Sequence, residues 1–274
     1  MKLRSVLSIA GSDSSVGAGI QADIKTIQAM GLFAQTAITA ITAQNTMGVT
    51  AVHDVPLDIV KAQIEAVFAD IRPDAVKIGM VSSADIAQVI GAALEEHAAE
   101  HVVVDPVMVA TSGSALASDG AVEGMRAYLF PHAEIITPNL AEAQVLAGFE
   151  IRTADDAWQA AQTISSACGA AVLVKGGHGL LGPGRAEDEA DACADDLLYL
   201  PDGTAKWFLG RRVDNPNMHG TGCTLSSAIA SGLAAGYDLI EAVSKAKDYI
   251  TLALEAQLAL GKGSGPLDHF WAMR

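Results

Sequence analysis

The stretch AVKIGMVSSADIAQVIGAALEEHAAEHVVVDPVM, residues 75–108, contains two strand-like segments on either side of a helical one. The apolar, β-branched segments at 75–81 and 101–108 are typical of buried strands. Residues 83–99 between them carry apolar side chains at helical spacing. A strand, a helix and a second strand in this order indicate a crossover that joins two parallel strands of one sheet.

The same alternation continues along the rest of the chain. We expect further strands at 5–11, 35–42, 134–139 and 170–177, and helices at 22–31, at 56–71 and twice near the C-terminus. The helix at 56–71 starts at Pro56 and should bury one face formed by Ile59, Ile64, Val67 and Phe68. The sequence therefore predicts an α/β fold, with a mostly parallel central sheet flanked by helices on both faces.

One segment departs from this alternation. Residues 197–213 contain two extended runs around Pro201–Thr204, which predicts a small β-hairpin or flap. The acidic residues 182–196 before it lack an apolar period, and we expect a surface loop there. Because no repeat, linker or break in composition occurs, we expect residues 1–274 to form a single domain.

Composition excludes several classes of protein. The 274 residues carry a formal net charge of −15, which argues against nucleic acid as a partner, because such binding depends on basic side chains that neutralise phosphates. No apolar stretch approaches the roughly 18 residues of a membrane span. The apolar run near the N-terminus ends at Gly11, too early for a secretory signal, and we expect it to be the first strand. We expect a cytoplasmic protein with no membrane contact.

Candidate functional residues lie where the expected strands end, because open α/β sheets bind ligands at the carboxyl ends of their strands. Polar or glycine-rich positions of this kind are Gly11-Ser12-Asp13, Gln44-Asn45, Gly79-Met80, Asp105, Thr137-Pro138-Asn139 and Lys175-Gly176-Gly177-His178.

The segment HGTGCT, residues 219–224, places two glycines and a cysteine at the expected start of a helix. Such a start exposes unpaired N–H groups that bind anions, so Gly220, Thr221 and Gly222 could form a phosphate cradle. A thiol there has a lowered pKa, and Cys223 could take a proton from a substrate hydroxyl. The alternative is a tight turn followed by a small buried cysteine. His219 receives no role.

Three further positions admit two interpretations each. Asn139 and Glu142 stand three residues apart at a helix start, where Glu142 either caps the helix or orders water around Mg²⁺. Asp105 could share the metal or cap the turn before Pro106. Lys175 ends an apolar strand and either points at phosphate or reaches solvent. Backbone donors, acids for a metal, a lysine and a base together describe a phosphoryl-transfer site.

Seven motifs occur in order along the chain: DSSVGAGIQADIKT (13–26), TAQNT (42–46), KIGM (77–80), DPVM (105–108), TPNLAEA (137–143), VKGGH (174–178) and HGTGCT (219–224). With them the sequence resembles the hydroxymethylpyrimidine and phosphomethylpyrimidine kinases of thiamine biosynthesis, in the ribokinase-like superfamily. The resemblance spans residues 5 to 271. It implies a ribokinase-like fold, a homodimer, ATP and Mg²⁺. It also implies phosphorylation of 4-amino-5-hydroxymethyl-2-methylpyrimidine and then of its monophosphate.

The resemblance also implies roles for individual residues. Cys223 would be the base above the cradle of Gly220, Thr221 and Gly222. The substrate would contact Gln44, which hydrogen-bonds the pyrimidine ring, together with Asp23, Gly11, Met80 and Val107. The nucleotide would lie near Lys175, Thr137 and Asn139, and Glu142 and Asp105 would organise Mg²⁺.

Two residues and one segment depart from the family pattern. Val16 stands where the family has a glycine, and valine disfavours positive φ, so the first loop should behave differently. Met218 replaces the usual Thr or Ser before the HGTGC segment, and the acidic segment 182–196 is long.

Two other functions compete with this interpretation. Pyridoxal kinases share the cysteine, although Gln44 and Met80 favour the pyrimidine. A non-catalytic module that senses a ligand on the same fold would need no base.

Overall fold

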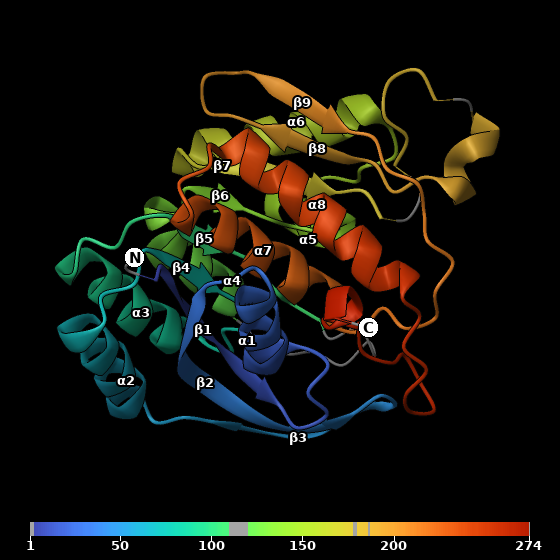
Figure 1. The fold of residues 1–274 in the computed structure, drawn as a ribbon. Helices are drawn as coiled ribbons and strands as arrows, with labels where there is room; N and C mark the ends of the chain where they lie inside the picture. Colours follow the sequence, from blue (N-terminus) through green and yellow to red (C-terminus); the bar gives the residue numbers. More distant parts are fainter. Residues whose placement is uncertain (1–2, 110–119, 178–179, 186, 274) are drawn as a thin grey trace. The chain divides into compact units, whose positions relative to one another are not determined.

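The computed structural model describes residues 3–109, 120–177, 180–185 and 187–273. Contacts divide the chain into two compact units. The larger unit contains the chain up to residue 132 and again from residue 215, and the smaller unit contains residues 133–214. Figure 1 labels the elements of both.

The larger unit is built on a sheet whose strands run in the order β3-β2-β1-β4-β5. Strand β1 (Ser5–Asp13) pairs in parallel with β2 (Phe33–Asn45) and with β4 (Ala75–Ile78), and β4 pairs in parallel with β5 (Val102–Val104). Strand β3 (Gly48–Asp54) runs antiparallel to β2 at the edge. The carboxyl ends of β1, β2, β4 and β5 therefore meet at one end of this sheet.

Helices cover both faces of this sheet (Figure 1). On one face lie α1 (Gly19–Ala29) and α7 (Thr221–Ala234), with α8 (Leu239–Glu255) packed on α7. On the other lie α2 (Leu57–Asp70) and α3 (Ala84–Glu96), followed by α4 (Ala121–Gly124), a π-helical turn (Met125–Leu129) and a 3₁₀ turn (Phe130–His132). The predicted α/β architecture of parallel strands between helix layers is confirmed in this unit.

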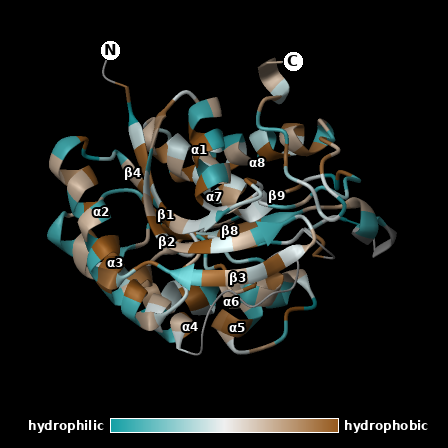
Figure 2. Cartoon of the chain, turned by 90° about the horizontal axis from the view of Figure 1, so that it is seen from below, coloured by the Kyte–Doolittle hydropathy of each residue, from teal (hydrophilic) through white to brown (hydrophobic). Residues whose placement is uncertain are grey.

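The core follows from the apolar strand sequences. Val6, Leu7, Ile9 and Ala10 of β1 are all fully buried, as expected for a parallel strand covered on both faces. Figure 2 shows brown along β1 and β2 and teal on outer turns of α1 and α2. A fully buried apolar side chain contributes about 1.5–3 kcal/mol relative to an exposed one, so these strands anchor the unit.

The buried face of α2 differs from the predicted one. Val60, Ile64 and Phe68 are buried, whereas Ile59 is 48% exposed and Val67 is half-buried. Successive residues of a helix are about 100° apart, so a face centred on Ile64 places Ile59 well outside it and Val67 at its margin. The prediction that Ile59 belongs to the buried face is wrong.

The smaller unit contains strands in the order β6-β7-β8-β9. Strand β6 (Ile135–Ile136) is parallel to β7 (Ala171–Lys175), and β8 (Asp196–Tyr199) and β9 (Ala205–Phe208) follow as an antiparallel hairpin. Helices α5 (Leu140–Ala147) and α6 (Ala154–Cys168) pack on these strands. The hairpin turn closes where predicted, with the Leu200 N–H donating to the Thr204 carbonyl at 2.8 Å.

The described residues of the acidic segment 182–196 lie partly at the surface and partly in the core of their unit. The segment contains a 3₁₀ helix (Glu187–Ala192), and Asp195 beyond it is fully buried. The Asp195 carboxylate accepts hydrogen bonds from the Gly182 and Gly210 N–H groups and from the Arg185 guanidinium. These donors compensate the buried charge of Asp195, which a surface loop would not bury, whereas Gly184, Glu189 and Asp191 of the same segment are exposed as expected.

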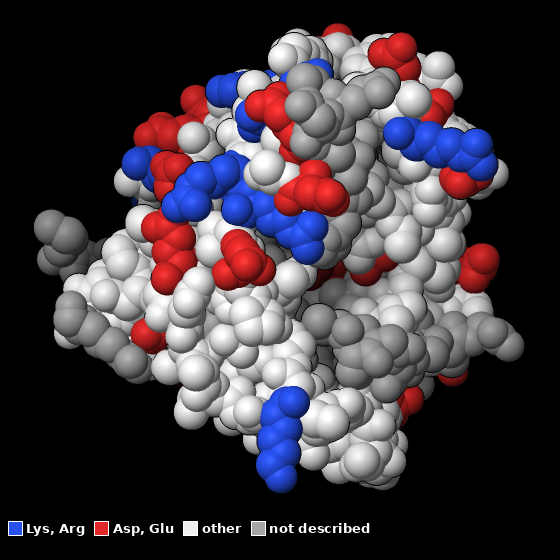
Figure 3. Space-filling view, turned by 90° about the vertical axis from the view of Figure 1, so that its right-hand side faces the viewer, with Lys and Arg blue, Asp and Glu red and all other residues white. Residues whose placement is uncertain are grey.

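Two further observations concern the surface charge and the hydropathy of the helices. On the face shown in Figure 3, acidic and basic side chains are interspersed. Within the residues that the structure describes, no helix is long and apolar enough to cross a membrane.

Candidate active site

Helix α7 begins as the sequence predicts, with Gly220 at its N-cap in the left-handed region (φ 85°) and no side chain capping it. A Cβ on Gly220 would lie 2.0 Å from the Gly17 carbonyl oxygen, so only glycine permits this contact. The Thr221 hydroxyl donates to the Met218 carbonyl. The first-turn N–H groups of a helix this long form a positive end that favours an anion.

Cys223 lies in the first turn of α7, close to charged groups of both signs. Burial raises the pKa of its thiol to about 11. Lys77 and the Gly19 backbone N–H lower that pKa, whereas the carboxylates of Asp23 and Asp105 raise it. The prediction of a lowered pKa is wrong for the protein without substrates, because burial and two acids outweigh the helix N-terminus and the lysine.

The lysine belongs to a fully buried ion pair. Lys77 Nζ, on β4, lies 3.0 and 2.9 Å from the two carboxylate oxygens of Asp23 on α1, and neither side chain is exposed to solvent. Hydroxyls of Ser8 and Ser227 also donate to Asp23. Burial alone would lower the pKa of Lys77, but Asp23 and the nearby Cys223 and Asp105 outweigh burial and raise it.

These contacts bear on the expected role of Asp23. Both carboxylate oxygens accept hydrogen bonds from protein donors inside the core. The contact of Asp23 with substrate stays a prediction. The observed role of Asp23 is to neutralise Lys77.

Asp105 lies just beyond β5 and is 1% exposed. Its N–H donates to the Ile78 carbonyl at 2.8 Å, and the Ser226 hydroxyl of α7 lies 3.5 Å from its Oδ2. Ser226 and Ser227, one turn after Cys223, thus reach Asp105 and Asp23. The carboxyl ends of β4 and β5 and the start of α7 therefore meet around the thiol.

The loop after β1 is organised by Asp13, a residue at a strand end for which the sequence predicts no role. Its carboxylate accepts hydrogen bonds from the Ser15, Gly17 and Ala18 N–H groups and contacts His219 at 2.7 Å. Burial raises the pKa of Asp13, but the hydrogen bonds from His219, Ser15 and Ala18 outweigh it and lower the pKa to about 2.

Val16 is the middle of this loop and adopts a positive φ of 65°. Its N–H donates to the Asp13 carbonyl, and its own carbonyl accepts from Lys25 Nζ at 2.7 Å. The loop thus keeps a backbone conformation that favours glycine, although valine occupies the position. Val16 thus adopts the positive φ that valine disfavours, and a difference in behaviour from the family's loop stays a prediction.

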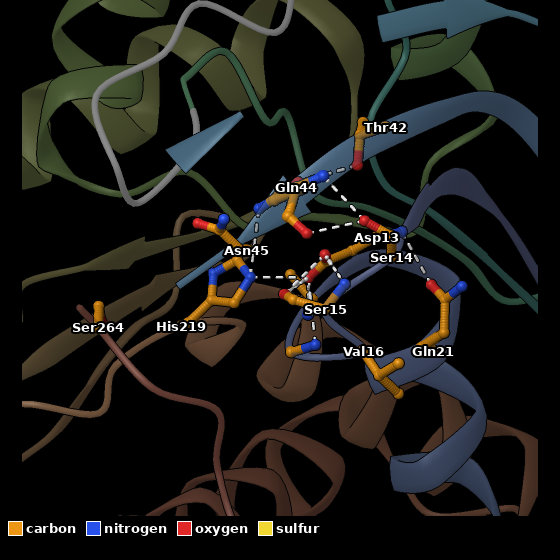
Figure 4. Close-up of polar contacts among 12 residues, drawn as sticks. Asp13, Ser14, Ser15, Val16, Gln21, Thr42, Gln44, Asn45, His219 and Ser264 are labelled. Atoms are coloured by element: carbon orange, nitrogen blue, oxygen red, sulfur yellow. Dashed lines mark hydrogen bonds and ion pairs between the residues drawn. The ribbon is translucent and has the colours of Figure 1, made fainter. Parts of the chain in front are cut away.

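Gln44, the predicted ring-binding residue, lies at the end of β2 beside this loop (Figure 4). Its side-chain amide is 3.2 Å from His219 Nε2 and 3.0 Å from the Thr42 hydroxyl. Its backbone is held by the Ser14 hydroxyl. The loop after β1, the end of β2 and His219 therefore lie next to one another.

The other predicted pocket residues lie at neighbouring strand ends. Gly11 and Met80 are in close contact, since a Cβ on Gly11 would lie 2.8 Å from Met80 Sδ. Met80 is 8% exposed, and Val107, two residues beyond Asp105, is half-buried. Their lining of a substrate pocket stays a prediction.

Four predicted residues lie in the smaller unit. Glu142 and Asn139 form a capping box at the start of α5, with backbone-to-side-chain distances of 2.8 and 2.9 Å. Thr137 is buried at the end of β6, and the Lys175 N–H donates to the Pro138 carbonyl. The capping alternative for Glu142 is thus observed. His178 of the VKGGH motif lies outside the described residues.

The two residues predicted to organise Mg²⁺, Asp105 and Glu142, are single carboxylates and do not belong to a ready-made cluster of metal ligands within the described part of the chain. No group of three or more His, Cys, Asp or Glu side chains suited to a metal ion occurs among the residues the structure describes. Asp105 and Glu142 each supply oxygen ligands of the kind Mg²⁺ accepts.

Residues 13–268 match the family model described as phosphomethylpyrimidine kinase. The chain is 51% identical over 268 residues to the hydroxymethylpyrimidine/phosphomethylpyrimidine kinase of Rhizobium meliloti (strain 1021), with 96% of each chain covered. The chain belongs to the phosphomethylpyrimidine kinase family. The resemblance identified from the motifs is confirmed.

Solved structures support the ribokinase-like fold of this kinase. The ADP complex of the Bacillus subtilis pyridoxal kinase matches with a TM-score of 0.88 at 35% identity, covering 99% of both chains. The phosphomethylpyrimidine kinase of Clostridium difficile 630 matches with a TM-score of 0.77 at 46% identity, covering 90% of this chain and 98% of that one.

Sequence reasoning missed three residues of this kinase. Asp13 ended a strand and was noted only for its position. His219 adjoined the glycine cradle, a signal that could have been used. Lys77 stood inside an apolar run, where only its unusual charge could have indicated a buried partner.

Proposed function

We propose that this kinase transfers the γ-phosphoryl group of ATP to the 5-hydroxymethyl group of 4-amino-5-hydroxymethyl-2-methylpyrimidine and then to the resulting monophosphate. The observation that carries the proposal is the convergence of Gln44 and the glycine-rich start of α7 on His219. An amide both donates and accepts, which suits an aminopyrimidine, and the helix start suits a phosphate. The names of the curated relatives support the same acceptor.

In this proposal Cys223 accepts the proton of the substrate hydroxyl. The hydroxyl oxygen forms a bond to the γ-phosphorus, the bond from that phosphorus to the β–γ bridging oxygen breaks, and ADP leaves. N–H groups around Gly220, Thr221 and Gly222 stabilise the charge on the transferred group. Cys223 can accept this proton only as a thiolate. Because burial raises the pKa of its thiol, Cys223 must first lose its own proton, and the positive charge of Lys77 favours that loss.

Four residues of the smaller unit have proposed roles toward ATP or Mg²⁺. Thr137, Asn139 and Lys175 would contact ATP, and Glu142 and Asp105 would hold Mg²⁺. When bound, the ion would neutralise phosphate charge. The carboxylates fit this role through their oxygen donors.

We further propose that residues 1–274 act as one kinase domain, that two copies form a homodimer and that the enzyme works in the cytoplasm. Sedimentation of the purified protein tests the dimer. A monomer at micromolar concentration, still active, would contradict it.

The decisive assay measures ADP release from MgATP with hydroxymethylpyrimidine, its monophosphate or pyridoxal as acceptor, and product masses are recorded. We expect turnover of both pyrimidines. The Cys223→Ser variant should retain substrate affinity and lose about 10²–10⁴-fold in kcat, the range for loss of a general base. A near-normal kcat in that variant would exclude Cys223 as the base.

Pyridoxal is the second candidate acceptor. The match to the Bacillus subtilis pyridoxal kinase over nearly the whole chain favours it. A kcat/KM for pyridoxal far above that for the pyrimidine would select this alternative. Tight binding of the pyrimidine and MgATP without ADP release would select the sensing module instead.

A further inference from the structure

We propose that His219 is a positioning residue. Held by Asp13, it determines whether the oxygen or the nitrogen of the Gln44 amide faces the imidazole, and so sets the orientation of the aminopyrimidine ring. This inference rests on the proposed function. It concerns a histidine that no step of the phosphoryl transfer uses.

His219 is clamped on several sides. It is 5% exposed, and its Nε2 lies 2.7 Å from Asp13 Oδ2 and 3.2 Å from the Gln44 amide nitrogen (Figure 4). A Cβ on Gly17 would lie 2.2 Å from His219 Cδ2, so the backbone of the loop covers the ring. Burial and the close approach of Gly17 restrict the movement of the imidazole away from Asp13 and Gln44.

The proton on Nε2 follows from its partners. Asp13 already accepts three backbone N–H groups and has a pKa of about 2, so it is an ionised acceptor. At 2.7 Å from that carboxylate, Nε2 must carry the hydrogen. A nitrogen that donates to Asp13 cannot also accept from the Gln44 amide.

One amide orientation satisfies all of these groups. If the Gln44 oxygen faces His219, it shares the Nε2 hydrogen, and the amide nitrogen faces Thr42. The Thr42 hydroxyl can accept from that nitrogen while it donates to the Ser12 carbonyl at 3.0 Å. The orientation drawn in Figure 4, with the Gln44 amide nitrogen toward His219, sets two N–H donors against each other, and the oxygen and nitrogen of an amide are assigned from such contacts. His219 therefore selects the first.

This selection matters because the substrate edge has a direction. The 4-amino group donates and ring nitrogen N3 accepts, so an amide binds both, with its oxygen on the amino group and its nitrogen on N3. Reversing the amide would require the ring to turn over. The 5-hydroxymethyl group, which neighbours the amino group, would then lie on the opposite side. Loss of His219 should thus weaken productive binding of the aminopyrimidine.

Two amide variants provide a matched test. His219→Gln can place an amide N–H near the former Nε2, whereas His219→Asn places the same group closer to the backbone. We expect His219→Asn and His219→Ala to raise KM for the aminopyrimidine at least tenfold, with less than threefold change in KM for MgATP. His219→Gln should stay within threefold of the wild type. Equal KM values in the Asn and Gln variants would overturn the inference.

A substrate analogue separates positioning from general damage. The wild type should prefer the aminopyrimidine over 5-hydroxymethyl-2-methylpyrimidine, which lacks the 4-amino group, and His219→Ala should reduce that preference at least tenfold. An equal loss of kcat/KM on both substrates would mean a merely structural role and would overturn the inference. Thermal unfolding identifies variants that fail to fold. If His219→Ala fails to fold, the comparison of His219→Gln with His219→Asn decides the test.

A turnover-independent measurement distinguishes this inference from the proposed function. Nitrogen-15 spectra of the histidines in the full chain, with His219→Gln for assignment, should show hydrogen on Nε2 of His219. Hydrogen on Nδ1 alone would overturn the inference even if the pyrimidine is phosphorylated. If neither pyrimidine binds in calorimetry or reacts, the proposed function fails, and the ring-orientation role fails with it, whatever the tautomer.

Discussion

At the scale of single residues, the thiol of Cys223 shows how burial competes with a favourable position. A helix N-terminus and a nearby ammonium group favour a thiolate, whereas burial and two carboxylates favour the neutral thiol. The neutral form prevails, with a pKa of about 11. At neutral pH only about one part in ten thousand of this group is ionised in the protein without substrates.

Alkylation of Cys223 by iodoacetamide should therefore be slow at pH 7 and rise about tenfold per pH unit up to pH 10, because only the thiolate reacts. Peptide-resolved mass spectrometry separates it from Cys168 and Cys193, and Cys223→Ser is the control. A rate that levels off below pH 9 would show that the pKa is not raised. Repeating the series with MgATP bound would measure how far the nucleotide changes the pKa.

The buried pair of Lys77 and Asp23 gives a stability prediction. Lys77→Met leaves Asp23 buried without its counter-charge and should lower the free energy of unfolding by about 3–5 kcal/mol. The double variant Lys77→Met with Asp23→Asn removes both charges and should lose less. Urea unfolding measures both. Additive losses in the double variant would contradict the pairing.

At the scale of elements, the loop after β1 carries strain at Val16. A positive φ costs a non-glycine residue on the order of 1 kcal/mol, and the 40% exposed side chain gains little from packing. Val16→Gly should therefore raise the free energy of unfolding by up to about 1 kcal/mol. Val16→Ala keeps the strain and serves as control. Denaturant unfolding with glycine less stable than alanine would refute the argument.

The strands and helices that the sequence predicted best are those whose burial is continuous. Residues 5–11 and 170–177 read as strands because both of their faces are covered. Strand β3 (Gly48–Asp54) was missed, since it lies exposed at the sheet edge and shows no apolar pattern. Helix α6 was missed although Thr153 and Asp156 form a capping box that the sequence displays.

The candidate site was predictable to a similar degree. The rule that ligands lie at the carboxyl ends of strands placed Gly11, Gln44, Met80 and Asp105 in one unit. The neutral state of Cys223, the pairing of Asp23 with Lys77 and the contact of His219 with Asp13 could not be predicted, because each depends on neighbours distant in sequence. Sequence patterns report local spacing, whereas pKa values depend on what surrounds a group in three dimensions.

At the scale of the whole molecule, acid stability depends on carboxylates like Asp13. Its folded pKa of about 2 lies below the usual value near 3.9. The stabilisation, about 2 kcal/mol, is therefore fully present above about pH 4 and is lost as pH falls toward 2. Urea midpoints measured from pH 5 to pH 2.5 should fall less steeply in Asp13→Asn. Parallel slopes for both proteins would contradict this.

The close approach of Gly17 to Gly220 also has a consequence for how the two substrates bind. The loop beside the proposed pyrimidine site and the proposed phosphate cradle share one backbone contact, with no side chain between them. A ligand that orders the loop around Gly17 also restricts the backbone at Gly220, and the reverse holds too. The second ligand then has less conformational entropy to remove when it binds. We therefore expect positive cooperativity between acceptor and nucleotide. By thermodynamic linkage, each ligand must increase the other's affinity by the same factor.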